Sequence, residues 1–162
     1  MATDPPADLQ LAPVTGEART IAEWLKTFQL AAVVLDPFTN ESAWILETAG
    51  AILSHFGGAD CRAAFIVTGT ADEAKAFLGP WADRILTFAD PDRAAVKGLG
   101  LNELPAFVQV RSDLTVAASA EGWDPLEWRE VAEHLAKNMS WSAPLIPTAT
   151  DPSPFAGSAA AG

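Results

Sequence analysis

The sequence predicts an α/β sandwich, in which a mixed sheet of about five strands carries helices on both faces. Unbroken apolar runs of strand length alternate with segments of helical periodicity, a pattern typical of parallel strands covered on both sides. The chain has 162 residues, of which 49% are hydrophobic, enough for one domain with a substantial core. The order of elements ends with a hairpin and one more helix, which predicts an antiparallel edge.

The first half of the chain predicts two helix and strand pairs. Apolar residues recur at helical spacing over residues 17–28, and an apolar run over residues 30–35 predicts a central strand. A second helix is expected over residues 41–56, because a glycine pair ends its apolar stripe. Residues 63–67 then predict a second buried strand.

The next segment predicts a third helix and a third strand. Thr70 and Glu73 have the spacing of a capping box, so a helix is expected over residues 71–83. A glycine and proline pair near its end should interrupt it. Residues 85–88 predict a short strand.

Prolines mark the start of several later elements. Asp90 is expected to cap a short helix whose first residue is Pro91. Pro105 opens an apolar strand that returns through a turn as a hairpin. Asp124 and Pro125 are expected to begin the last helix in the same way as Asp90 and Pro91 begin the short one.

Both ends of the chain are poor in apolar periodicity. Residues 1–16 are predicted to be a flexible N-terminal segment, residues 17–141 the domain, and residues 142–162 a tail rich in Pro, Ala and Gly. Short apolar clusters in the tail leave three outcomes open. The tail could dock on a partner, wrap the surface of its own domain, or stay disordered.

Charge limits the partners of the protein. The formal net charge of −11 disfavours nucleic acid and anionic membranes and is compatible with a protein or peptide partner of basic character. No apolar stretch has the length of a membrane span or of a signal peptide, so a cytoplasmic, bacterial-type protein is expected. The sequence does not indicate the oligomeric state.

The single Cys61 excludes an internal disulfide and cannot by itself build a metal site. His55 and His134 are too scattered to add ligands. No metal and no cofactor are therefore expected. Free cysteine is often a buried core residue, and this is the simplest role for Cys61.

The stretch around Leu104-Pro105 carries a resemblance to a known superfamily. The pair follows a turn that contains glycine and opens a strand leading into a hairpin and the last helix. With the order of elements, it resembles the thioredoxin superfamily over about residues 17–138. The helix and strand inserted at about residues 71–88 are similar to the branch with thiol-disulfide proteins and peroxiredoxins. The resemblance implies a thioredoxin-like three-layer sandwich with a cis peptide bond before Pro105.

The cysteine motif of that superfamily is missing. The resemblance places its two cysteines at Ser42 and Ile45, and neither side chain can form the required thiolate. Pro37, Thr39 and Ser42 are also similar to the proline, threonine and peroxidatic cysteine of peroxiredoxins, although this pattern is better explained by Thr39 or Asn40 acting as a helix cap. Disulfide exchange at this position is excluded.

These observations lead to a hypothesis of a non-catalytic adaptor or chaperone-like binding module. Its candidate groove consists of Ser42, Trp44, Leu104 and Pro105, where tryptophan would supply an apolar contact. One alternative is a monothiol oxidoreductase or peroxidase-like enzyme that uses Cys61. Another is a structural subunit of a larger assembly, held by the C-terminal tail.

Overall fold

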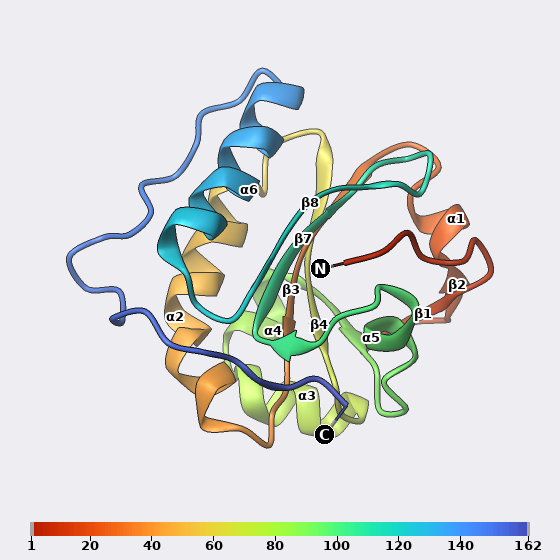
Figure 1. The fold of residues 1–162 in the computed structure, drawn as a ribbon. Coiled ribbons are helices and arrows are strands. Elements are labelled where there is room, and N and C mark those ends of the chain that lie inside the picture. Colours follow the sequence, from red (N-terminus) through yellow and green to blue (C-terminus); the bar gives the residue numbers. More distant parts are fainter. Residues whose placement is uncertain (1, 162) are drawn as a thin grey trace.

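A mixed, twisted sheet forms the middle layer of the protein in a computed structural model, which describes residues 2–161 (Figure 1). Three central strands are parallel, and the strands that flank them are antiparallel. The sheet has seven strands, in the order β2 (Arg19–Thr20), β1 (Gln10–Pro13), β5 (Leu86–Ala89), β4 (Cys61–Val67), β3 (Gln29–Leu35), β7 (Ala106–Val110) and β8 (Val116–Glu121).

The predicted number of about five strands is too low. The five expected strands correspond to β3, β4, β5, β7 and β8, and the two additional strands come from the N-terminal part of the chain. β1 pairs with β5 and β2 pairs with β1. Without β1, this edge of β5 would present unpaired backbone N–H and C=O groups.

Helices cover both faces of the sheet, as the sequence predicts (Figure 1). One core contains apolar side chains from α2 (Asn40–His55), α3 (Ala71–Leu78) and α6 (Pro125–Asn138), with α4 (Trp81–Arg84) packed against it. The other core contains side chains from α1 (Ile21–Trp24) and α5 (Ala94–Gly98). The α/β sandwich with helices on both faces is confirmed.

The central strand β3 shows why its apolar run is continuous. Ala31, Val33 and Leu35 belong to the core under α2 and α6, whereas Leu30, Ala32 and Val34 belong to the opposite core. All six side chains are at most 1% exposed. A strand with apolar layers on both faces has no position for an outward polar side chain.

The helix expected over residues 17–28 is wrong in extent. Only α1 is helical, because Arg19 and Thr20 pair with β1 and Thr20 then caps the helix through a capping box with Glu23. Leu25, also fully buried, is already the C-cap. The apolar spacing therefore marks a buried stripe that continues beyond the helix.

Two other helix boundaries follow from local chemistry. Gly79, at φ +58°, and Pro80 separate α3 from α4, as predicted for this pair. The helix expected to begin at Pro91 begins at Ala94 instead. Asp90 still caps it, since its carboxylate accepts hydrogen bonds from the backbone N–H groups of Ala95 and Val96.

Both ends of the chain pack on the domain. Beyond α6 the chain runs back along the α2 side and crosses the end of the molecule beneath the sheet, in blue in Figure 1. There β9 (Ser158–Ala159) pairs with β6 (Glu103–Leu104) in a separate two-stranded sheet. At the other end, Thr3 N–H donates to the carbonyl of Leu99 at 2.7 Å. Of the three outcomes left open for the tail, the structure shows the one in which it wraps its own domain. The domain boundaries themselves remain a prediction.

Candidate functional site

The carboxyl end of β3 meets the first turn of α2 at the position where the sequence analysis expected the degenerate cysteine site. Ser42 is fully buried, and its Oγ accepts a hydrogen bond of 2.9 Å from the backbone N–H of Asp36. Ile45 is also fully buried. Ser42 therefore joins the strand to the helix and presents no hydroxyl to a substrate.

A buried ion pair lies beside this junction. Asp36 is 2% exposed and accepts a 2.9 Å hydrogen bond from the guanidinium of Arg93. Arg93 is the N-cap residue of α5 and has a left-handed backbone, with φ of 57°. The sequence analysis missed Arg93, because no local pattern connects it with an aspartate 57 positions earlier.

The four residues of the candidate groove differ in accessibility. Ser42, Leu104 and Pro105 are buried, whereas Trp44 is 57% exposed. The peptide bond between Leu104 and Pro105 is cis. Trp44 and Leu104 both contact the C-terminal tail, through Phe155 and through strand β9 respectively. The tail thus covers part of the surface that the sequence predicts as a groove.

Cys61 lies at the opposite end of the sheet. It is the first residue of β4 and pairs with Gln29, the first residue of β3, while Asp36 follows the last residue of β3. At about 3.3 Å per residue, a strand of this length places the thiol about 20 Å from the α2 junction. The only thiol of the chain is therefore outside the position used by the superfamily.

The surroundings of Cys61 disfavour its thiolate. Burial, and in addition the negative charge of Asp60, raise the pKa of the Cys61 thiol to about 11. The thiol also lies 3.8 Å from the carbonyl oxygen of Phe56, with Sγ as donor. Arg62, the neighbouring cation, donates from Nε to the carbonyl of Trp24 at 2.6 Å.

Cys61 is nevertheless partly accessible, and it lines a surface pocket of about 570 Å³. The pocket lies between the end of α2 and the loop before β5. It has one aromatic wall, Phe28, and two cations, Arg62 and Arg84. A small disulfide or an extended peptide chain could reach the thiol from this side.

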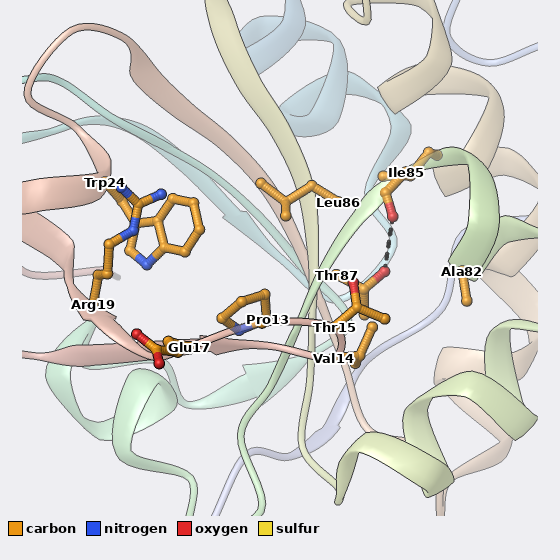
Figure 2. A pocket seen from close by; sticks show the side chains of 11 residues that line it. Pro13, Val14, Thr15, Glu17, Arg19, Trp24, Ala82, Ile85, Leu86 and Thr87 are labelled. Atoms are coloured by element: carbon orange, nitrogen blue, oxygen red, sulfur yellow. Dashed lines mark hydrogen bonds between the residues drawn. The ribbon is translucent and has the colours of Figure 1, made fainter.

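A second pocket, of about 490 Å³, lies under the loop between β1 and β2 (Figure 2). The guanidinium of Arg19 stacks over the Trp24 ring at 3.8 Å, and Trp24 Nε1 donates to the carbonyl of Leu11. Thr87 donates its hydroxyl to the carbonyl of Ile85, the dashed line in Figure 2. Trp24 and Thr87 thus donate to backbone carbonyls, and Arg19 stacks on Trp24.

Within residues 2–161, no group of three or more His, Cys, Asp or Glu side chains could hold a metal ion. His55 Nε2 lies 2.7 Å from the carbonyl oxygen of Ser142, and His134 Nδ1 lies 2.6 Å from Gln109 Oε1. The two histidines thus take part in separate structural contacts. Over the same residues, no helix is long and apolar enough to cross a membrane.

Comparison with known proteins identifies the fold. No protein-family profile and no curated protein sequence matches the chain. Among solved structures, a cysteine-to-serine mutant of peroxiredoxin Q from Xanthomonas campestris aligns with a TM-score of 0.64 and 14% identity, over 83% of this chain and 93% of the other. The fold is thioredoxin-like.

Two further thioredoxin-like neighbours support this conclusion. A secreted disulfide oxidoreductase from Mycobacterium tuberculosis aligns with a TM-score of 0.58 and 14% identity, over 72% of this chain and 85% of that protein. An exposed lipoprotein thioredoxin from Streptococcus pneumoniae aligns with a TM-score of 0.61 and 15% identity, over 82% of this chain and 100% of the other. This thioredoxin-like chain differs from the superfamily pattern in having one cysteine and no Cys-x-x-Cys motif.

The hypothesis of a non-catalytic adaptor is contradicted by these neighbours. They are redox proteins, a disulfide oxidoreductase and a peroxiredoxin among them. The alternative that uses Cys61 fits this finding better than the adaptor does. The sequence analysis placed the adaptor first because Ser42 and Ile45 stand at the superfamily cysteine positions, and it kept the Cys61 reaction as the alternative.

Proposed function

We propose that this thioredoxin-like protein takes part in thiol-based redox chemistry through Cys61. The observation that carries the proposal is a partly accessible thiol, the only one in the chain, beside a pocket in a fold shared with redox enzymes. The Cys61 thiolate attacks a disulfide, forms a mixed disulfide and releases the other half as a thiolate, which takes up a proton. An external thiol then restores Cys61 and carries away the bound half as a new disulfide.

The high pKa of Cys61 determines the character of this reaction. With a pKa of about 11, only about one thiol in ten thousand is ionised at pH 7, so the first step is slow. A thiol of high pKa is also a poor leaving group, which makes the mixed disulfide long-lived once it has formed. We propose a monothiol that forms persistent mixed disulfides, rather than a rapid exchange catalyst.

We further propose a basic protein or peptide as the partner and a cytoplasmic location. The net charge of −11 attracts cationic partners at long range. A single unpaired cysteine is compatible with a reducing compartment. Both proposals follow from the sequence.

A peroxidase reaction at the same thiol is the competing candidate. There the thiolate attacks one peroxide oxygen, forming a sulfenic acid and releasing water or an alcohol once the leaving oxygen is protonated. A small disulfide tests the first reaction, and peroxide consumption with reduced glutathione tests the second. The full chain should slowly form a mixed disulfide, seen as a mass increase of the intact chain that reduced glutathione reverses, and Cys61→Ser should form none.

Asp60→Asn is the control variant matched to Cys61→Ser. It removes a negative charge that raises the Cys61 pKa and leaves the thiol in place, so the disulfide reaction at pH 7 should become several-fold faster. Equal rates for the natural chain and Cys61→Ser would contradict the proposal. Peroxide consumption by a chain that forms no mixed disulfide would instead favour the peroxidase.

The pH dependence of Cys61 alkylation gives an independent prediction. Iodoacetamide reacts with the thiolate, so the rate should rise about tenfold per pH unit between pH 7 and pH 10 and level off only near the pKa. Mass spectrometry of the intact chain measures the rate, and circular dichroism at each pH confirms that the fold is retained. A rate that levels off near pH 8 would show an ordinary exposed thiol.

A further inference from the structure

Two surface pockets meet at the start of β5. The pocket drawn in Figure 2, lined by Arg19, and the pocket lined by Cys61 have Ile85 and Leu86 in common. Leu86 is the first residue of β5 and pairs with Ala64, whereas β4 already begins three residues earlier. Residues 61–63 therefore have no partner on β5, and all three line the Cys61 pocket. The difference in strand length leaves a notch at this end of the sheet.

Guanidinium groups and aromatic rings alternate around this notch. Arg19 stacks on the Trp24 ring, as Figure 2 shows, and Arg62 lies 5.3 Å from the centroid of the same ring. Arg62 also lies 5.8 Å from the centroid of the Phe28 ring. Within residues 2–161, every cation–π contact involves an arginine that lines one of the two pockets, Arg84 being the third. The rings thus hold three cations at one end of the sheet.

The N–H groups of these arginines have few acceptors in the protein. Among residues 2–161, the side chains of Arg19 and Arg84 make no hydrogen bond or ion pair. Arg62 donates only from Nε, to the carbonyl of Trp24 at 2.6 Å. Stacking fixes a guanidinium and leaves the N–H groups in its plane available, which is the geometry that binds a carboxylate or phosphate through two hydrogen bonds.

The charge at the notch differs from that of the whole molecule. Three arginines line the two pockets with only two carboxylates, those of Glu17 and Asp60, and neither carboxylate forms an ion pair with them. The chain as a whole carries a net charge of −11. At about 0.15 M salt, the Debye length of about 8 Å screens repulsion from the more distant acidic groups. A small anion that contacts the arginines is therefore attracted by them.

We propose that the notch at the start of β5 is a binding site for a small aromatic dianion. The guanidinium groups of Arg62 and Arg84 bind its carboxylate or phosphate oxygens. The ring of Phe28, which is 37% exposed, and the side chain of Leu86 contact its aromatic body. A flat ligand is favoured because one ring can stack on both an aromatic side chain and a guanidinium plane.

The site does not depend on the redox reaction proposed for Cys61, because binding requires only the arginines and the apolar wall. The two are nevertheless neighbours, since Cys61 lines the same pocket. A bound dianion should therefore obstruct the approach of a reagent to the thiol. This contact gives a second measurement of where the ligand binds.

The experiment uses the full chain with phenyl phosphate and phthalate, two aromatic dianions that carry a phosphate and two carboxylates respectively. Isothermal titration calorimetry should show binding of at least one of them, and the tighter one identifies the preferred oxyanion. Arg84→Gln and Arg62→Gln should each weaken this binding by about tenfold, as expected for the loss of a charge-assisted hydrogen bond. Arg111→Gln is the matched control, because it removes the same charge from an exposed residue outside both pockets.

Two further measurements test the place and the class of the ligand. A saturating probe should slow iodoacetamide alkylation of Cys61 several-fold, and inorganic phosphate, which has no aromatic body, should bind more weakly than phenyl phosphate. Arg84 is exposed, so Arg84→Gln should remain folded, as circular dichroism can verify. The proposal is overturned if neither probe binds the natural chain, if Arg84→Gln binds as tightly, or if a bound probe leaves alkylation unchanged. Equal binding of inorganic phosphate and phenyl phosphate would overturn the assignment of an aromatic ligand.

Discussion

At the scale of single residues, buried polar groups decide which side chains are available for chemistry. Ser42, Asp36 and Arg93 satisfy one another or the backbone, and together they connect β3, α2 and α5. Cys61 has no such network and keeps a partly accessible thiol. Its reactivity is limited by desolvation and by the Asp60 charge.

Asp90 gives a prediction at this scale. Burial raises the pKa of Asp90 above its usual 3.8, although hydrogen bonds from the α5 backbone oppose that shift. An acid with a raised pKa binds more protons in the folded state, so its contribution to stability is full at low pH and is lost as the pH rises through the folded-state pKa.

Asp90→Asn removes this titration and keeps an oxygen that can accept from Ala95 N–H. The free energy of unfolding of Asp90→Asn, relative to the natural chain, should therefore increase as the pH rises from 4 to 7. Urea denaturation at several pH values measures this difference. A difference that does not change with pH would show that the Asp90 pKa is not raised.

At the scale of elements, α2 packs closely against α4 at one position. Gly50 in the middle of α2 faces the ring of Trp81, and a Cβ at this position would lie 2.5 Å from the ring. In a helix interior, alanine is more favourable than glycine by about 1 kcal/mol. This helix propensity opposes the steric overlap with the Trp81 ring. The overlap should prevail, because Trp81 also donates its indole N–H to Glu47.

Gly50→Ala should lower the free energy of unfolding by about 1 to 3 kcal/mol, the cost of overpacking a core. Urea denaturation monitored by circular dichroism measures this change in the free energy of unfolding. The control is Gly50→Ala in a Trp81→Ala background, where the ring is absent and the substitution should be neutral or stabilising. Destabilisation of similar size in both backgrounds would exclude the ring as the cause.

At the scale of the whole molecule, the negative charge opposes the compact state. A net charge of −11 on 162 residues produces self-repulsion, which salt screens. Adding about 0.3 M NaCl should raise Tm by roughly 2 to 4 °C, equivalent to about 1 kcal/mol for a domain of this size. Differential scanning calorimetry measures Tm, and an equal effect of KCl is the control. A fall in Tm would show that attractive ion pairs dominate.

The sequence by itself determined the layers of this protein. Unbroken apolar runs, such as residues 30–35, and the cap and proline of α6 are local signals, and they predict parallel buried strands and helix starts without knowledge of the fold. Such local signals do not predict which strands pair when the strands are far apart in the sequence. β1 and β2 were missed because no local pattern shows which strand edge they will complete.

Only the tertiary structure decided which residues share a surface. Folding brings Arg93 to Asp36, Phe155 to Trp44, and β9 to β6, over sequence separations that carry no periodic signal. It also places Cys61 and the degenerate cysteine positions at opposite ends of β3 and β4. The physical reason is that contacts between distant segments depend on the summed packing of the whole core, whereas caps and apolar runs depend on neighbours along the chain.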